Sequence, residues 1–195
     1  MRRILYLVKE KVGNLSSEGL KLSENNLRYK FCPHCGGKLS LEETFPLSRP
    51  KCVDCNRIFY QNPAVGVAAI IIRDKKILLG RRNASYSDMW CIPCGYAEYY
   101  EDAREALIRE IKEETNLDIK LSIVFDIHSN FHNPAQHTVG IWFLVEEYQG
   151  NIAPGDDIEA LDFFSTAEIK EQNIVLAFPT DVRVLDDLVN KGLIL

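Results

Sequence analysis

Apolar runs between residues 64 and 191 predict most of the secondary structure of this chain. A dense β-branched run at 65–72 resumes at 76–79 after Arg73-Asp74-Lys75, which predicts two strands joined by a hairpin. Further strands are expected at 119–128, 138–147 and 158–164, and helices at 102–115, 167–171 and 180–191. Strands around a central helix, with another helix at the end, predict an α/β fold: a three-layer sandwich over a mixed sheet.

The first 60 residues lack a comparable pattern. Residues 1–30 have only a weak helical periodicity, which predicts a short helix and a linker. Residues 31–60 hold two cysteine pairs with few large apolar residues between them, so this module is not expected to fold on a hydrophobic core alone. We therefore divide the chain into 1–30, 31–60 and a main domain at 62–195.

Composition narrows the possible partners. Of the 195 residues, 46% are hydrophobic and 26% charged, which excludes a disordered or fibrous chain. The net charge of -5 argues against a protein that coats nucleic acid or an anionic membrane, so a polyanionic substrate would need a metal ion. No apolar run approaches the roughly 18 residues of a membrane span, and the five apolar residues after Met1-Arg2-Arg3 are too few for a signal peptide. We expect a cytoplasmic protein without a membrane partner.

Two Cys-x-x-Cys pairs separated by sixteen residues predict a zinc ribbon. Gly36 and Asn56 follow the second cysteine of each pair, and both residue types tolerate the left-handed backbone that such a turn often needs. Four thiolates fill the coordination sphere of Zn²⁺, so the site is expected to be structural; the alternative is a remnant that no longer binds metal. The four predicted zinc ligands are Cys32, Cys35, Cys52 and Cys55.

A third pair, Cys91 and Cys94, lies in an apolar segment after Trp90. No second pair or histidine cluster stands in obvious register with it. Two buried free thiols are therefore expected here, rather than a metal or redox site.

The helix expected at 102–115 carries glutamates on its apolar face. At about 100° per residue, Glu110 and Glu114 fall in the middle of this face and Glu113 at its edge. Buried carboxylates cost several kcal/mol each unless a cation compensates, and no lysine or arginine of the helix lies on that face. The pattern therefore predicts bound Mg²⁺ or Mn²⁺. The apolar side chains that define the face are Ala103, Ala106, Leu107 and Ile111.

The ends of this helix also have recognisable signals. Asp102, with Glu105 three residues on, is a variant of the capping box and predicts a start near Ala103. Asn116 is expected to end the helix in the left-handed conformation.

Residues 95–117 resemble the Nudix box, G-x5-E-x7-R-E-U-x-E-E-x-G-U, where U is aliphatic. The one departure is Asn116, where the family has glycine, and asparagine is the next best left-handed residue. The box spans 23 residues and is highly specific, and Nudix-like flanking residues extend the resemblance to about 62–190. The matching positions are Gly95, Glu101, Arg109, Glu110, Ile111, Glu113, Glu114 and Leu117.

The resemblance implies an enzyme that splits a nucleoside-diphosphate-linked compound with metal-activated water. In this chain Glu110 and Glu114 would be the principal metal ligands, and Glu113 a further ligand or a water-orienting group. Arg109 and Glu101 would brace these carboxylates. Further candidates are the carbonyl of Cys94 as a backbone ligand and, as general base, Glu159 ahead of Glu146 and Glu147.

A zinc ribbon ahead of a Nudix domain is similar to the NADH pyrophosphatases, but their S-Q-P-W-P-F-P-x-S motif is missing, and 177–180 is its nearest match. Residues 91–98 look more like ADP-ribose pyrophosphatase-like members, so ADP-ribose or a related dinucleotide is the expected substrate. Phe131, His132 and Phe178 are candidate contacts to it.

Two alternatives remain open. One is a non-catalytic Nudix-fold sensor or nucleic-acid-binding module, motivated by basic residues around the cysteines. The retained acidic ligands and the acidic residues Glu42, Glu43 and Asp54 speak against it, so nucleic acid is not an expected partner. The other is homodimerisation through the ribbon. The basic residues are Lys30, Lys38, Arg49, Lys51 and Arg57.

Overall fold

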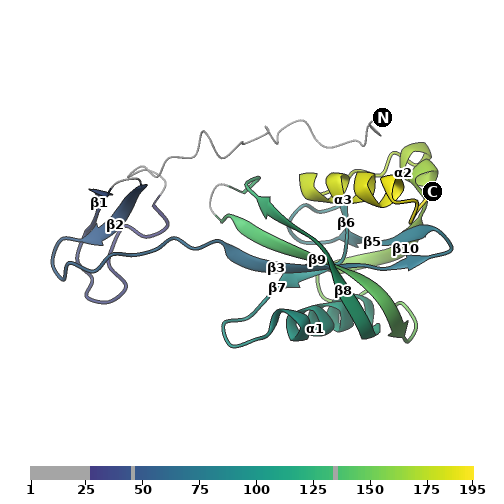
Figure 1. Cartoon of the computed structure of the whole chain (residues 1–195), viewed down its shortest axis with the longest axis horizontal. Helices are drawn as coiled ribbons and strands as arrows, with labels where there is room; N and C mark the ends of the chain where they lie inside the picture. The colour runs from purple at the N-terminus through teal and green to yellow at the C-terminus, as the bar shows by residue number, and fades with distance from the viewer. Residues whose placement is uncertain (1–26, 45–46, 134–135) are drawn as a thin grey trace.

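The computed structural model describes residues 27–44, 47–133 and 136–195 (Figure 1). The helix expected within 1–30 falls outside the described residues, except for 27–30, which are not helical. The strands are β1 (Leu39–Thr44), β2 (Leu47–Cys52), β3 (Ala64–Ile70), β4 (Ile72–Arg73), β5 (Lys76–Arg82), β6 (Trp90–Cys91), β7 (Cys94–Tyr96), β8 (Asp118–Asn130), β9 (Thr138–Gln149) and β10 (Ile158–Phe164). The helices are α1 (Ala103–Thr115), α2 (Thr166–Glu171) and α3 (Pro179–Asn190).

The main domain is built on two four-stranded sheets between helices. One sheet has the order β7-β3-β9-β8 and is mixed, because β3 runs parallel to β9. The other has the order β10-β5-β4, with β6 pairing β5, and its pairs are antiparallel. Helix α1 covers one side and α2 with α3 the other (Figure 1), which confirms the predicted α/β class.

The apolar run at 65–72 serves both sheets. The expected hairpin is present but short: β4 pairs with β5 across a turn in which Asp74 and Lys75 have φ of 52° and 62°. The longer part of the run, β3, pairs instead with β7 and β9. The predicted hairpin is therefore confirmed between β4 and β5, but the sequence did not show that most of the run belongs to the other sheet, because a strand buried on both faces carries no signal for its neighbours.

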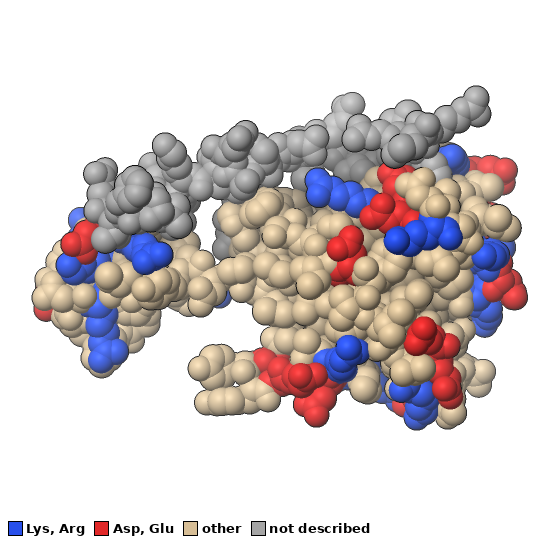
Figure 2. All heavy atoms as spheres, viewed as in Figure 1, with Lys and Arg blue, Asp and Glu red and all other residues tan. Residues whose placement is uncertain are grey.

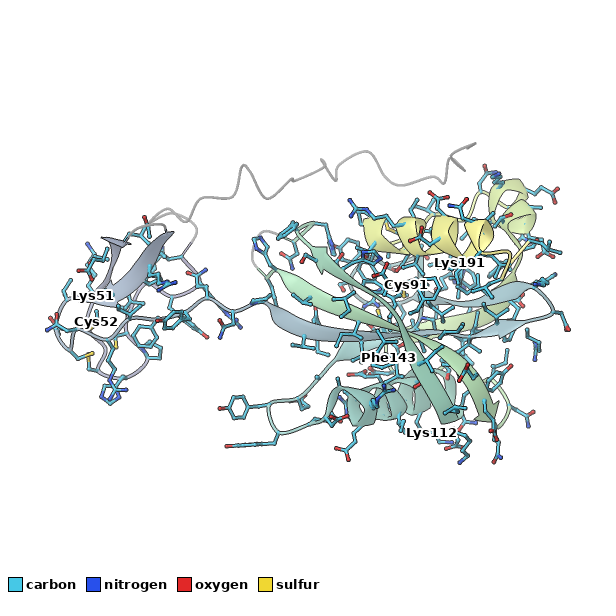
Figure 3. All side chains as sticks on the ribbon, viewed as in Figure 1. Lys51, Cys52, Cys91, Lys112, Phe143 and Lys191 are labelled. Atoms are coloured by element: carbon cyan, nitrogen blue, oxygen red, sulfur yellow. The ribbon has the colours of Figure 1, made fainter. Side chains whose placement is uncertain are left out.

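Both faces of β3 are buried, and alternate residues pack in opposite directions. Val67 and Ala69 belong to the cluster that includes the apolar face of α1, whereas Ala68 and Ile70 belong to the cluster that includes α3. Phe143 of β9 fills the space on the α1 side (Figure 3). The alternation follows from the two-residue period of a strand.

Helix α1 begins and ends where the sequence predicts. The Asp102 carboxylate accepts a hydrogen bond from the Arg104 amide at 2.8 Å. Asn116 adopts the left-handed conformation with φ of 61°, and its amide donates to the Lys112 carbonyl. These caps fix the register in which the glutamates of α1 meet the sheet.

The cysteine module lies to one side of the main domain in Figure 1, at the end where β3 begins. Its strands β1 and β2 form an antiparallel pair. Its core consists of Cys32, Leu39 and Cys52, with Cys55 and Phe59 packed against them. Such a small core agrees with the expectation that the module depends on a metal.

None of the helices among the described residues combines the length and the hydropathy that a bilayer-spanning segment needs.

Candidate active site

A cavity of about 470 Å³ opens between the mixed sheet, α1 and the loops around β10 and α3. Strand β3 supplies part of its wall, and Glu110 and Glu114 of α1 line it. Asp157 and Asp181 add carboxylates from the loop before β10 and the first turn of α3, and Arg82 contributes a guanidinium group. The cavity thus has the size and the polar lining of a small-ligand site.

The two glutamates predicted to face inward do so. Glu114 is 2% exposed, and its Oε2 accepts a hydrogen bond from the Cys94 amide at 2.9 Å. Glu110 is 13% exposed at the side chain, and its Oε1 accepts from the Tyr96 amide at 3.1 Å. Glu113, expected at the edge of the face, has a 52% exposed side chain. Both inward carboxylates are therefore held by the backbone of β7.

The environment of Glu114 fits a bound cation. Burial raises the pKa of its carboxyl well above the usual range, and the neighbouring Cys91 and Asp157 raise it further. No ion pair to Glu114 is found among residues 27–44, 47–133 and 136–195. A hard divalent cation would favour the ionised form, and carboxylate oxygens are the ligands that Mg²⁺ and Mn²⁺ take.

Gly95 allows Glu110 to approach β7. A Cβ atom at this position would lie 2.0 Å from the Glu110 Cδ atom and 2.1–2.4 Å from its carboxylate oxygens. A larger residue here would therefore displace the Glu110 carboxyl group. The position of the Glu110 carboxylate thus depends on the absence of a side chain at Gly95, whose backbone conformation is one that any residue can adopt.

Arg109 ties the acidic residues together. Its Nε and Nη2 atoms donate to the two oxygens of Glu101 at 2.8 Å, and its Nη1 donates to Glu110 at 2.8 Å and to Glu113 at 3.2 Å. Nη2 also donates to the Tyr96 carbonyl at 3.0 Å. The hydrogen bonds from Arg109 are the largest cause that lowers the pKa of Glu101 to about 2. These contacts have the geometry of the bracing role expected for Arg109 and Glu101.

Glu159, the leading sequence candidate for a base outside the box, does not line the cavity. Its carboxylate forms an ion pair with Arg81 Nε at 2.8 Å on the antiparallel sheet. Asp156 and Asp157, three and two residues earlier, line the cavity instead, and Arg82 forms an ion pair with Asp157. The exposed Glu146 and Glu147 of β9 are also absent from the lining.

Aromatic rings form a separate part of the cavity wall. Phe178 and His132 lie 5.4 Å apart between ring centroids, and Tyr86 lies 5.4 Å from Phe178 and 6.1 Å from His132. Burial lowers the pKa of His132. Phe131 does not line the cavity and packs against His137 at 5.2 Å. The structure therefore brings together two of the three predicted contact residues and adds Tyr86.

Asp181 and Tyr86 were missed by sequence reasoning. Asp181 is 2% exposed, accepts a hydrogen bond from the Ile92 amide at 3.2 Å, and has a pKa raised by burial. Its place in the first turn of a helix after Pro179 is an ordinary signal for a helix start, so nothing marked it as a cavity residue. Cys91 and Cys94 are both free cysteines; Cys91 is buried as predicted, whereas Cys94 is only partly buried.

The four cysteines of the ribbon converge as a metal site requires. Their sulfur atoms all lie within 4.8 Å of one another, with Cys32 to Cys55 at 3.7 Å and Cys35 to Cys52 at 3.5 Å. Tetrahedral Zn²⁺ with Zn–S bonds of about 2.3 Å places its sulfurs about 3.8 Å apart. The hydrogen bond from the Cys55 amide is the largest cause that lowers the pKa of the Cys52 thiol to about 7. The donor set therefore fits zinc.

The two turns that carry the cysteines also have the predicted backbone. Gly36 has φ of 79° and Asn56 has φ of 59°, so both are left-handed. The amides of these residues donate to the carbonyls of Cys32 and Cys52 at 2.9 and 3.0 Å. Each turn therefore holds its pair of sulfurs on one side.

Buried glutamates on a helix that faces a cavity, in an α/β sandwich of this topology, define the class of Nudix-type proteins. The NUDIX domain family matches residues 62–186, and the chain belongs to this family. Nudix enzymes use divalent metals, in agreement with the carboxylates of α1.

Two curated relatives indicate where in the family the chain lies. It is 37% identical over 107 residues to an ADP-ribose pyrophosphatase of Methanocaldococcus jannaschii, a match that covers 54% of this chain and 63% of that protein. It is 27% identical over 155 residues to the NAD-capped RNA hydrolase NudC of Pectobacterium carotovorum, covering 78% of this chain and 57% of that protein. The chain thus spans less than two thirds of the length of these relatives.

Solved structures agree on the fold. A NUDIX hydrolase from Nitrosomonas europaea is 28% identical, with a TM-score of 0.64, and the match covers 84% of this chain and 92% of that chain. A bifunctional NMN adenylyltransferase/ADP ribose pyrophosphatase from Francisella tularensis is 23% identical, with a TM-score of 0.55, and the match covers 68% of this chain and 42% of that chain. The second likeness concerns the fold alone.

Proposed function

We propose that this chain hydrolyses the pyrophosphate bond of a nucleoside diphosphate linked to another moiety, with an ADP-ribose-like dinucleotide as the favoured substrate. The observation that carries the proposal is Glu114, a 2% exposed carboxylate that faces the cavity beside Glu110. A cation bound there would both offset the burial of the carboxylates and attract a diphosphate. The similarity to an ADP-ribose pyrophosphatase supports the choice of substrate.

In this proposal Glu110 and Glu114 hold Mg²⁺ or Mn²⁺, with Glu113 as a further ligand or water-orienting group and the Cys94 carbonyl as a backbone ligand. Such a cation lowers the pKa of bound water and neutralises phosphate charge. Arg109 keeps the carboxylate of Glu110 in place through its 2.8 Å hydrogen bond. The protein's part in the reaction is thus to orient oxygen ligands and to keep them out of bulk water.

A carboxylate from outside the box is also proposed to act as a base. Glu159 is paired with Arg81 and lies outside the cavity lining, which weakens the sequence-based choice. Asp156 lines the cavity, and no ion pair to it is found in the described part of the chain. We therefore favour Asp156 for this role.

Phe178 and His132, joined by Tyr86, are proposed to contact the base of the substrate. Their rings occupy one wall of the cavity, whereas the carboxylates of α1 line another part. A flat base could stack on these rings while its diphosphate lies near Glu110. Phe131 is not part of this wall.

The remaining proposals concern the metal of the ribbon, the cellular location of the protein and its oligomeric state. We propose that Cys32, Cys35, Cys52 and Cys55 hold a structural Zn²⁺, which their sulfur spacing supports. Cysteine pairs that bind metal suit a reducing compartment, so we propose a cytoplasmic location. A homodimer formed through the ribbon would be detected by light scattering with and without zinc chelation.

Product identification tests the proposed function. The protein is incubated with ADP-ribose, NADH, diadenosine polyphosphates and capped RNA, each with Mg²⁺ or Mn²⁺, and the products are identified by mass spectrometry. We expect metal-dependent cleavage between two phosphorus atoms of at least one of these compounds, and cleavage more than about 100-fold slower by Glu114→Gln. Absence of metal-dependent cleavage of every diphosphate would overturn the proposal.

A further inference from the structure

Charge is divided unevenly between the ribbon and the main domain. Residues 27–60 contain six Lys and Arg against three Asp and Glu, whereas residues 61–195 contain twelve against twenty-two. In Figure 2 several basic side chains gather on the visible face of the ribbon, with little acidic surface between them. One of the six, Lys51, is paired with Glu42 at 2.7 Å. The ribbon is therefore basic, although the chain as a whole has a net charge of -5.

The same module exposes large aromatic side chains. Tyr29, Phe31 and Tyr60 are 47%, 65% and 63% exposed. An arginine lies over the ring of each tyrosine. The Arg28 guanidinium carbon lies 5.6 Å from the centroid of Tyr29, and that of Arg49 lies 4.9 Å from the centroid of Tyr60. Arginine stacked on an aromatic ring keeps its planar fork of donors available to a phosphate.

The two arginine–tyrosine pairs lie on neighbouring segments. The amide of Arg28 donates to the side chain of Gln61 at 3.2 Å, which joins the segment before the first cysteine pair to the one that follows the second. The amide of Phe59 donates to the Pro50 carbonyl at 2.8 Å and holds the latter segment beside β2. We call the four residues Arg28, Tyr29, Arg49 and Tyr60 the arginine–tyrosine surface.

We propose that the arginine–tyrosine surface binds single-stranded nucleic acid. Bases of any sequence can stack on exposed tyrosine rings, and phosphates between them meet the adjacent guanidinium groups. The positive charge favours a polyanion over a second copy of the chain, because an isologous dimer would bring the same arginines face to face. A duplex would hide its bases from the rings, so a single strand is the better fit.

The surface lies close to the proposed active site along the chain. Tyr60 precedes Gly66, a residue of the cavity wall, by six positions. A fully extended segment of six residues spans at most about 22 Å. A bound strand therefore runs within that reach of the cavity wall. The proposed binding does not depend on hydrolysis, so the binding experiment tests it separately from the function proposed above.

Fluorescence anisotropy tests the proposal on the full-length, zinc-loaded protein. The probes are a labelled 12-nucleotide single-stranded RNA and the corresponding duplex, each at 50 and 200 mM salt. We expect the single strand to bind more tightly than the duplex, and its affinity to fall as salt rises, with a log–log slope of about -1.4 if two phosphates are neutralised.

Matched variants locate the binding. Tyr60→Ala is expected to weaken single-strand binding at least about fivefold, and Tyr60→Phe to retain it, because stacking needs the ring and not the hydroxyl. Arg49→Gln is expected to weaken binding and to reduce the salt slope by about 0.7, whereas Lys120→Gln, the same change of charge on the main domain, leaves both unchanged. Zinc content of each variant verifies that the ribbon remains folded.

Three results would overturn the proposal. One is the absence of salt-dependent binding, and another is an equal loss of affinity in Tyr60→Ala and Lys120→Gln. The third is a dimer, measured by light scattering, that Tyr60→Ala converts to a monomer, because the surface would then be occupied by a second copy of this chain.

Discussion

Arg109 and Glu101 form a two-bond ion pair, with Nε to Oε1 and Nη2 to Oε2 both at 2.8 Å. The pair connects the second turn of α1 to the loop that precedes the helix. The same guanidinium group reaches Glu110. The position of Glu110, a proposed metal ligand, is therefore linked to a loop residue nine positions earlier in the chain.

This ion pair predicts an acid-sensitive contribution to stability. The pKa of Glu101 is lowered from 4.5 to about 2 in the folded protein, so the folded state favours the ionised carboxylate. Its contribution is present above the unfolded pKa and is lost as pH falls from about 4.5 towards 2. We expect Glu101→Gln to have a lower urea midpoint than the parent at pH 7 and the difference to shrink below pH 4.5. A constant difference over that range would contradict the assignment.

Removal of the charge of Glu114 is expected to separate activity from stability. Glu114→Gln keeps the shape of the side chain but removes a metal ligand, so hydrolysis should fall by more than about 100-fold. Without added metal, the melting temperature should stay the same or rise, because a buried carboxylate is costly to ionise. Calorimetry of Mg²⁺ and Mn²⁺ binding and thermal melts measure both effects; Glu105→Gln on the outer face of α1 is the control.

Gly95→Ala tests the contact between β7 and Glu110. The new methyl group would overlap the carboxyl group of Glu110, so this side chain must move away. A displacement of about 1 Å is expected to lower kcat about 100-fold. Gly192→Ala is the matched control: it strains a left-handed glycine with φ of 68° and open space around it, so it should lose stability but not kcat. Comparable kcat values for both variants would contradict the interpretation of this contact.

Tyr86 is expected to affect substrate binding more than turnover. If its ring helps to hold the base of the substrate, Tyr86→Ala should raise KM for ADP-ribose at least about fivefold, and Tyr86→Phe should have little effect. Steady-state kinetics of the two variants measure this difference. Tyr99→Ala removes a ring that is 88% exposed and does not line the cavity, so its KM should match that of the parent.

Loss of zinc is expected to leave the proposed hydrolysis intact. Cys52→Ser removes a ligand that is 0% exposed, so bound zinc should fall from one ion per chain to none. All residues that line the cavity lie at position 66 or later, and we therefore expect ADP-ribose hydrolysis to change by less than about twofold. Zinc analysis and an activity assay with added Mg²⁺ check the two statements. A large loss of activity would mean that the ribbon supports the cavity.

Short-range patterns predicted one half of the candidate site. The inward direction of Glu110 and Glu114 follows from helical periodicity, and the caps Asp102 and Asn116 follow from residue type, all within the fifteen residues 102–116. Likewise, the left-handed turns at Gly36 and Asn56 follow from residue type and from the cysteine spacing. These features depend only on neighbours in sequence.

The other half depends on contacts between distant segments. Tyr86 has φ of 60°, an uncommon conformation for a residue of its size, and no pattern in the sequence marks it. Asp157 reaches the cavity wall because Arg82, seventy-five residues earlier, pairs with it. Glu159, in the segment 158–160 before Phe163 and Phe164, was the leading sequence candidate, but it lies within β10 and pairs with Arg81 of the neighbouring strand. Which carboxylate reaches a site is decided by the partner strand, which the local pattern does not specify.

Residues 64–73 contribute strands to both sheets, and this has a consequence for how the cavity can open. Gly66 of the mixed sheet and Arg82 of the antiparallel sheet both line the cavity, and β3, β4 and β5 connect them, with breaks at Ile71 and at the turn of Asp74 and Lys75. A hinge between them would have to lie at Ile71, whose side chain is fully buried and whose carbonyl accepts a hydrogen bond from the Leu78 amide at 2.9 Å. We therefore expect the exposed loops that carry Tyr86 and Asp156 to move more readily than this buried connection.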